Sequence, residues 1–446
     1  MKEMETDALI IGGGPLALLL ALKLHKKGMK VSLAGESVPG NPPINPEMML
    51  VGGDDTLPPL FQHSLAQWRG IADELGLPPL LTTSPALDLA TSQGRVTKLR
   101  QEATLDALGG EPVSFIESPP EEAPRALGAK MWEEAPVLLP NTVQMLQLAV
   151  ANAGIERRLI NPAALSIVDL SHPQLTLQTG EVLQARHIIF TSARALRRVL
   201  PPLGLALPLR PARGHVLVLQ TPQPHGLPLM LQRLHRGHIF IVPVSSKRVD
   251  IHYDAINDPA QSTLNMRTSQ SLINALYQHV EFMIPSLSGA EVLGTTVSRF
   301  WLTPDFLPAL GPWPGLPGVY VGVGWGGRGT ALAAGAADIL SQLVLTGETG
   351  VNIQSMAPNR FANGLWQVVK QPGSLTWQEP SIEIDTSLMS IKPEYMENVN
   401  LVEAPKPQYA TKVNQVEKTV VESAGRRAAP TMQAKSKPKV TTAPVK

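Results

Sequence analysis

Residues 8–36, ALIIGGGPLALLLALKLHKKGMKVSLAGE, constrain the fold of this chain more than any other stretch. They read as a short apolar strand, a glycine turn, a helix with leucine along one face and a second strand. The turn has the spacing G-x-G-x-x-G/A, which Gly12, Gly14 and Ala17 fill. Because this spacing lies between a strand and a helix, it predicts a βαβ unit that binds a dinucleotide.

Each of these small residues has a physical role in such a unit. Gly12 permits the tight turn, Gly14 leaves the backbone open to a pyrophosphate, and Ala17 lets the helix pack closely on the strand. The phosphates would lie over the helix N-terminus, whose free N–H groups favour an anion. We therefore expect one set of cofactor-binding residues to be Gly12, Gly13, Gly14, Pro15 and Ala17.

A ribose-binding carboxylate is expected where the second strand ends. By register this position is Gly35, and the carboxylate follows one residue later, at Glu36. We include Glu36 among the expected cofactor-binding residues. The offset leaves two outcomes open: Glu36 still reaches the ribose, or cofactor binding is weakened.

Composition excludes several kinds of site. The chain has 446 residues, enough for two or more domains, and it contains no cysteine. Disulfides, thiolate metal sites, a cysteine nucleophile and a cysteine-tethered cofactor are therefore excluded, and we expect no metal site. The residues before the first strand are an acidic mixture, and the apolar run at 8–22 is shorter than the ~18–20 residues of a membrane helix. We expect a cytoplasmic protein without a membrane span.

The C-terminal part of the chain differs from the rest in charge and pattern. Residues 405–446 carry nine Lys or Arg and two Glu, a net charge of +7, whereas the whole chain has +1. From 376 onward no hydrophobic period persists, so we interpret 376–446 as a disordered basic tail that is available to a protein partner. Apart from Tyr409, the basic stretch at 405–446 has no aromatic residue, and we expect no nucleic-acid role.

Motifs of rival chemistries are missing from the sequence. There is no GxxxxGKS/T phosphate loop, no HExxH metal motif and no GxSxG nucleophile turn. A hydrolase built from scattered Ser, His and Asp stays open as an alternative, although nothing spaces these residues.

A second informative stretch is 318–345, GVYVGVGWGGRGTALAAGAADILSQLVL. It again reads as an apolar strand, a glycine-rich turn and a long helix of small residues. The turn predicts a second group of backbone N–H donors beside a helix N-terminus. The alternative is a tightly packed strand–helix crossover without a ligand.

Together the two stretches resemble the FAD-dependent oxidoreductases of the D-amino-acid oxidase family, which includes glycine oxidase and monomeric sarcosine oxidase. Three further motifs carry the resemblance, which covers about residues 6–350. Residues 303–311, TPDFLPALG, are similar to the family's TPDGLP-x-IG. Residues 324–329, GWGGRG, are similar to TG-x-GGHG, and residues 210–216, RPARGHV, are similar to RP-x-RGQ.

The resemblance implies an α/β fold with two parts. One is a Rossmann-like FAD-binding domain with a βαβ unit and a parallel sheet, assembled from residues 1–85, 141–212 and 301–375. The other is a substrate domain with an antiparallel sheet, assembled from residues 86–140 and 213–300, which roofs the flavin.

The resemblance also implies chemistry and contacts. FAD is the expected cofactor, held noncovalently, and the expected reaction is oxidation of an amine or amino acid by hydride transfer to the flavin. Oxygen or an electron carrier would then accept the electrons. The second set of expected cofactor-binding residues is Gly324, Gly326, Gly327, Arg328, Gly329 and Thr330. Arg328 and the following helix N-terminus would stabilise the negative charge of reduced flavin.

The substrate side departs from the family. Family members often present an arginine to the substrate carboxylate, but by register Phe300 takes its place and Arg299 comes one residue early. On a strand this offset means the opposite face unless a bulge re-aims the side chain. The expected catalytic residues are Arg299, Tyr253 and Trp325, of which Trp325 either stacks on a substrate or walls the pocket.

Two further departures bear on the site. Ala193 replaces a family glycine, and His252 is expected either near the flavin or in the core. These departures leave an alternative open: a flavin-binding protein with a structural or partner role and no working amino-acid site.

Overall fold

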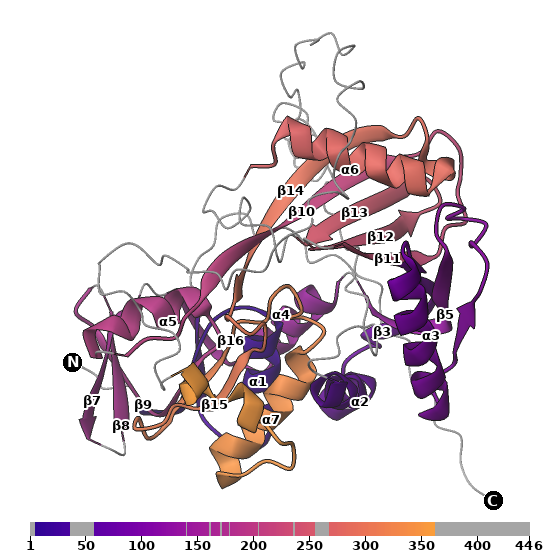
Figure 1. The fold of residues 1–446 in the computed structure, drawn as a ribbon. Coiled ribbons are helices and arrows are strands. Elements are labelled where there is room, and N and C mark those ends of the chain that lie inside the picture. The colour runs from indigo at the N-terminus through magenta and orange to yellow at the C-terminus, as the bar shows by residue number, and fades with distance from the viewer. Residues whose placement is uncertain are drawn as a thin grey trace, which may run out of the picture. The chain divides into compact units, whose positions relative to one another are not determined.

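The computed structural model describes residues 5–35, 58–139, 141–159, 162–169, 172–177, 179–203, 205–234, 237–254 and 267–361. Within these residues the chain forms two eight-stranded sheets with helices packed on them (Figure 1). The expected ribose contact Glu36 and the expected tail at 376–446 lie outside the described residues.

Sheet A is mostly parallel and has the strand order β15-β16-β9-β1-β2-β6, with β7 and β8 attached through β9. β1 pairs in parallel with β2 and β9, β9 pairs in parallel with β16, and β2 pairs in parallel with β6. Its strands are β1 Glu5–Ile11, β2 Val31–Gly35, β6 Glu156–Leu159, β7 Pro162–Asp169, β8 His172–Leu177, β9 Val182–Phe190, β15 Ala309–Pro312 and β16 Val319–Val323.

Helices cover both faces of sheet A, which explains why its central strand is a continuous apolar run. Ala8 and Ile10 of β1 pack on one side with α1, α2, α4 and α7, whereas Leu9 and Ile11 pack on the other side with α5. These helices are α1 Pro15–Lys26, α2 Pro58–Leu75, α4 Thr142–Asn152, α5 Ala193–Val199 and α7 Ala333–Thr346.

Sheet B has the order β14-β10-β13-β12-β11-β3-β5-β4 and is antiparallel except for the parallel pair of β3 and β11. Its strands are β3 Leu81–Ala90, β4 Val113–Ile116, β5 Gly128–Leu138, β10 Arg210–Gln220, β11 Leu229–Leu234, β12 Gly237–Ser245, β13 Arg248–Asp254 and β14 Glu291–Leu302. Two longer helices belong to this part, α3 Gln93–Leu108 and α6 Gln270–Met283. Short 3-10 turns complete the described structure: η1 Pro201–Leu203, η3 Pro285–Leu287, η4 Gln354–Met356 and η5 Pro358–Phe361.

Successive residues of a strand point to opposite faces, so the register assigns two faces to sheet B. Figure 1 shows α6 lying along one face of sheet B, the α6 face. This face carries Leu217 and Ile251, which pack with Leu276 and Val280 of α6. The second face carries the intervening positions, among them Gly214, His252, Asp254 and Phe300. This assignment decides which side chains can share a site.

The predicted fold class, a parallel sheet plus an antiparallel-rich sheet, is confirmed. Sequence patterns placed the strands and helices of both glycine stretches correctly. Leu81 is the first residue of β3, a few residues before the expected boundary at 86.

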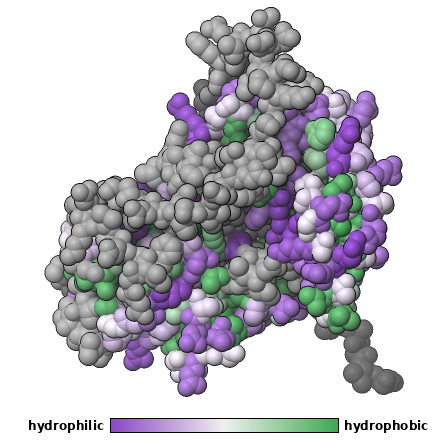
Figure 2. All heavy atoms as spheres, in the orientation of Figure 1, coloured by the Kyte–Doolittle hydropathy of each residue, from purple (hydrophilic) through white to green (hydrophobic). Residues whose placement is uncertain are grey.

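The surface around α3 is mixed in character. Leu105 and Leu108 of this helix are 68% and 80% exposed, and Figure 2 shows hydrophobic and hydrophilic surface interspersed over α3. Among the described helices, none is long and apolar enough to cross a membrane.

Candidate functional site

The first glycine turn leaves an open stretch of backbone at the end of β1. Gly12 has φ 156° and packs so closely on β9 that an added Cβ would lie 2.0 Å from Thr191 Oγ1. Gly13 and Gly14 are exposed, and an added Cβ on either would meet no atom within 4 Å. The turn is therefore closed on the strand side and open on the other, where a phosphate group fits.

The helix that follows presents its N-terminus at this opening. Gly14 is the N-cap of α1, Pro15 is its first residue, and Ala17 is fully buried against the sheet. A glycine N-cap brings no side chain to satisfy the first helical N–H groups, so they are available to an anion. All five of the first set of predicted contacts thus lie in one turn and one helix end.

Three parallel strands end side by side at this edge. β1 is flanked by β9, and β9 is flanked by β16, so the turns after Ile11, Phe190 and Val323 are neighbours. Thr191 N and Ser192 N both donate to Ile11 O at 3.0 Å and close the edge between β1 and β9. Ligands of open α/β sheets bind at such carboxyl ends, beside the point where the strand order reverses.

Ala193, which replaces a glycine of the resembling family, starts α5 behind this edge. The helix is capped by Ser192, whose Oγ accepts from Ala195 N at 3.2 Å. A helical position accommodates alanine without strain, so this substitution leaves the edge intact.

The second glycine turn follows β16 and contacts the end of β14. Gly326 has φ 62°, and an added Cβ would lie 2.6 Å from Leu302 Cδ2. Gly326 N donates to Trp301 O at 3.1 Å, and Trp325 forms a β-bridge with Leu302. An edge strand of sheet B is therefore hydrogen-bonded to a turn that leaves sheet A.

The remaining residues of this turn are held tightly. Gly329 lies against Trp325, since an added Cβ would meet its Cβ at 3.6 Å, and Thr330 is buried. Ala331 O accepts from Ser64 Oγ at 2.7 Å and from Trp68 Nε1 at 3.0 Å, both on α2. The start of α7 is thereby fixed under the second turn.

Arg328 is a constrained residue of this turn. Its Nε donates to Trp325 O at 3.2 Å and its Nη2 donates to Phe306 O. Burial lowers the pKa of Arg328 to about 10, so the guanidinium stays charged at neutral pH. A fixed cation at this position suits an anionic group bound along the turn.

Trp325 is oriented toward its own domain. Its Nε1 donates to Gly322 O at 2.9 Å, and the side chain packs against the core that contains α1 and α7. Two roles were open to Trp325, and this orientation favours lining the pocket rather than stacking on a substrate.

Tyr253 and Arg299 lie on the α6 face of sheet B. Tyr253 packs in the cluster of Leu276 and stacks on His215, with ring centroids 6.4 Å apart. Arg299 is opposite Arg213 in the pairing of β14 with β10, and the register there is unbroken; the one irregularity of this pair lies between Val218 and Leu219. The structure therefore does not bring these two expected catalytic residues together with the glycine turns.

The second face meets the second glycine turn through Asp254 and Phe300. An added Cβ on Gly327 would lie 2.9 Å from Asp254 Oδ2 and 3.9 Å from Phe300 Cε1. Desolvation by burial raises the pKa of Asp254 to about 7. Sequence reasoning missed Asp254; the available signal was an acidic residue that ends an otherwise half-buried strand.

His252 lies on the same face as Asp254. Its Nε2 is buried and has no hydrogen-bond partner among the described residues, and desolvation lowers its pKa to about 4. A neutral imidazole with an unpaired nitrogen lies on the side expected for the flavin, rather than in the α6 cluster.

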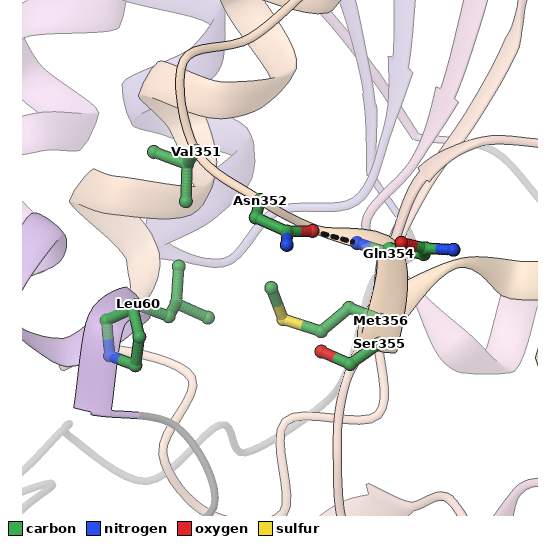
Figure 3. Close-up of a pocket in the computed structure, with 7 residues that line it drawn as sticks. Leu60, Val351, Asn352, Gln354, Ser355 and Met356 are labelled. Atoms are coloured by element: carbon green, nitrogen blue, oxygen red, sulfur yellow. Dashed lines mark hydrogen bonds between the residues drawn. The ribbon is translucent and has the colours of Figure 1, made fainter.

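A separate cavity of about 540 Å³ lies at the start of α2 (Figure 3). Its lining has no ionisable side chain, and Asn352 Oδ1 is engaged by Gln354 N at 3.0 Å. None of its residues belongs to either glycine turn; they are Pro59, Leu60, Val351, Asn352, Gln354, Ser355 and Met356. The described residues also hold no cluster of three or more side chains suited to a metal ion.

Comparison with known proteins gives consistent matches along the chain. Residues 7–343 match the family model described as DAO, FAD dependent oxidoreductase. Glycine oxidase of Geobacillus kaustophilus is 24% identical over 379 residues, which cover 79% of this chain and 97% of that protein. Glycine oxidase of Pseudomonas putida is 23% identical and covers 80% of this chain and 99% of that protein.

Solved structures agree in fold. The crystal structure of the Geobacillus kaustophilus glycine oxidase has a TM-score of 0.70, covering 80% of this chain and 99% of that chain at 23% identity. L-Proline dehydrogenase from P. horikoshii has a TM-score of 0.69, covering 81% and 99% at 16% identity.

Proposed function

Because the chain belongs to the DAO family of FAD-dependent oxidoreductases, we propose that it oxidises an amine or amino acid with FAD bound along the carboxyl edge of sheet A. One observation carries the proposal: two glycine turns end parallel strands of one sheet, separated only by β9. Two relatives that match over 97% and 99% of their own length are glycine oxidases, which supports an amine or amino acid as the substrate class.

The residues present fit FAD at both ends. The open backbone at Gly13 and Gly14, with the α1 N-terminus, would hold the pyrophosphate. The turn from Gly324 to Thr330 would hold the flavin ring, with Arg328 supplying positive charge. When bound, FAD accepts a hydride from the carbon that bears the substrate nitrogen.

On the substrate side, we propose that the chain selects a less acidic or bulkier amine than glycine. Phe300 lies on the second face, whereas Arg299 lies on the α6 face. A small amino-acid carboxylate would lack the arginine fork that usually binds it. Burial of a carboxylate without a cation costs several kcal/mol, on the order expected for an unpaired charge.

The cofactor is tested by absorbance of the purified protein and by one substitution. The protein should be yellow and should release FAD in acid, and Gly14→Val should fold but lose most of the FAD. The valine has room in the structure, since no atom lies within 4 Å of the added Cβ, but it fills the space required by the phosphates.

Gly226→Val is the matched control, because Gly226 is an exposed loop glycine with the same free space. It should retain FAD. A colourless wild-type protein that FAD does not reconstitute would overturn the proposal.

The reaction is tested by anaerobic addition of amines, amino acids and hydroxy acids to the yellow protein. Bleaching of the flavin identifies the reducing substrate, and air or an added electron carrier then identifies the acceptor. Arg299→Ala and Phe300→Ala should be compared for this bleaching. If Arg299→Ala alone abolishes turnover of a simple amino acid, Arg299 is the carboxylate ligand and the proposed pocket is wrong. If no compound bleaches the flavin, the structural or partner role is the better explanation.

A further inference from the structure

Asp254 and Phe300 converge on one point although they come from different strands. β10 lies between their strands, and it places Gly214 opposite Asp254 and Ala212 opposite Phe300. An added Cβ on Gly214 would lie 3.0 Å from Asp254 Oδ1 and 3.4 Å from Phe300 Cε1. The absence of a side chain at Gly214 therefore lets a carboxylate and an aromatic ring lie beside each other.

The same two groups border the second glycine turn. A Cβ added to Gly327 would lie 2.9 Å from Asp254 Oδ2, and the Phe300 ring lies next to it. The Asp254 carboxyl group thus packs between the two glycines, and at Gly214 the Ser298 hydroxyl and the Phe300 ring lie beside it. The carboxyl group lies where the turn expected to hold the flavin meets the second face of sheet B.

Within the described part of the chain, Asp254 makes no hydrogen bond or ion pair with another residue. The Nε and Nη2 donors of Arg328 go to the backbone carbonyls of Trp325 and Phe306. Desolvation raises the pKa of the Asp254 carboxyl group to about 7, yet part of its surface stays accessible. A desolvated carboxylate without a partner is stabilised by a cation, and the accessible part of Asp254 lets such a cation reach it.

We propose that Asp254 and Phe300 form a subsite for the positively charged nitrogen of an amine, so that the substrate is recognised through its cation rather than through a carboxylate. The inference rests on the proposed function, whose substrate class it narrows. An ammonium group donates a charge-assisted hydrogen bond to the carboxylate and makes a cation–π contact with the ring. Where the resembling family offers an arginine, this chain offers Phe300 beside an acid, so the charge preference of the pocket is reversed.

The pH dependence of binding follows from the groups around Asp254. His252 lies on the same strand, His238 lies opposite Asp254 on β12, and Arg328 lies on the glycine turn. On the same face, β10 contributes Arg210, at the end of the strand beyond Ala212, and β14 contributes no charged residue between Gly294 and Leu302. Burial lowers the pKa of both histidines to about 4 and that of Arg328 to about 10, so Asp254 is the group that titrates between pH 6 and 8.5. A primary ammonium stays charged over this interval, so amine binding should become about tenfold tighter as the pH rises.

The experiment is equilibrium dialysis of the FAD-loaded protein, without oxygen, against radiolabelled n-butylamine and the uncharged 1-pentanol. At pH 8.5, Asp254→Asn should bind the amine at least tenfold more weakly and pentanol unchanged, and its amine binding should lose the pH dependence. Asp250→Asn is the matched control. Asp250 is on the same strand and face but is paired with Arg248, at 3.1 Å and 3.2 Å, and its replacement should leave amine binding unaltered.

FAD content, measured on the same samples, separates the two proposals. If the protein is yellow and Asp254→Asn binds butylamine as tightly as the wild type, the cationic subsite is wrong and the proposed function is retained. Colourless protein that binds butylamine through Asp254 overturns the proposed function and supports the subsite.

A second variant covers the case in which Asp254→Asn does not fold. Phe300→Leu keeps an apolar side chain and removes the aromatic face, so amine affinity should fall severalfold while pentanol affinity is retained. Equal losses for both compounds would show a general packing defect and contradict the subsite.

Discussion

Gly335 fixes the closest approach of α7 to α2, and Gly335→Ala should destabilise the protein. An added Cβ would lie 2.8 Å from Ser64 Cα and 2.9 Å from both Ser64 Cβ and N. Two of these atoms are backbone and cannot rotate away. Ser64 Oγ also accepts from Gly335 N at 3.0 Å and donates to Ala331 O, so the helices would separate at their hydrogen-bonded contact.

The size of the effect follows from three opposing terms. Alanine is favoured over glycine in a helix interior by about 1 kcal/mol. Overpacking costs about 1–3 kcal/mol, and two weakened buried hydrogen bonds cost about 1 kcal/mol each. The net expectation is a loss of about 2–4 kcal/mol in the free energy of unfolding, together with a lower FAD content, because α7 begins directly after the second glycine turn.

The measurement is thermal and denaturant unfolding of the FAD-loaded protein, with Gly70→Ala as the control. Gly70 lies within α2, and an added Cβ there meets no atom within 4 Å, so only helix propensity acts and the variant should gain up to about 1 kcal/mol. If Gly335→Ala proves as stable as Gly70→Ala, the close contact of α2 and α7 does not limit packing and the reasoning is refuted.

Three further predictions test other features. Phe306 has φ 60° where the resembling family has glycine, so Phe306→Gly should be more stable than Phe306→Ala by about 1 kcal/mol in urea unfolding; the reverse order would refute backbone strain. Lys23 is buried and forms ion pairs with Glu74 at 2.9 Å and Asp338 at 3.3 Å, so Lys23→Met should cost about 3 kcal/mol because both carboxylates lose this partner. Asp338→Asn should restore part of the loss in the double variant, and an unchanged melting temperature would contradict this. The pKa of Asp254 is raised from 3.8 to about 7, so folding favours its neutral form, and the wild type loses stability relative to Asp254→Asn as the pH rises from about 4 to 7. Melting temperatures of the two proteins should therefore coincide near pH 4 and favour the variant at pH 8, and a constant difference across this range would contradict the shift.

Local pattern was sufficient for the cofactor side of the molecule. The turn at Gly12 and the turn at Gly326 are each fixed by a strand, a short glycine run and a helix that are contiguous in sequence, so spacing alone located them. The strands β11 and β15 were not predicted, because each is short and its partners lie far away along the chain.

The substrate side depended on information that no local pattern contains. Alternation shows that Tyr253 and Asp254 point to opposite faces, but it does not say which face meets the second glycine turn. Tertiary packing decides this, because α6 covers the face of Tyr253 and leaves the other to Gly327. The resemblance indicated that Arg299 is one residue out of phase with the family's arginine. Because the register of β14 is unbroken around Arg299, its side chain stays on the α6 face.

β14 belongs to sheet B by its ladder with β10 and reaches the sheet A turn through Gly326 N and the bridge of Leu302 with Trp325. Because β14 is hydrogen-bonded to both sheets, the free energy of unfolding of one sheet should depend on the other. Filling the glycine turn with a ligand should slow amide hydrogen exchange along β14 as well as in the turn itself. Sheet B and the carboxyl edge of sheet A should accordingly unfold in a single cooperative transition. A ligand bound at the glycine turn should therefore also raise the stability of sheet B.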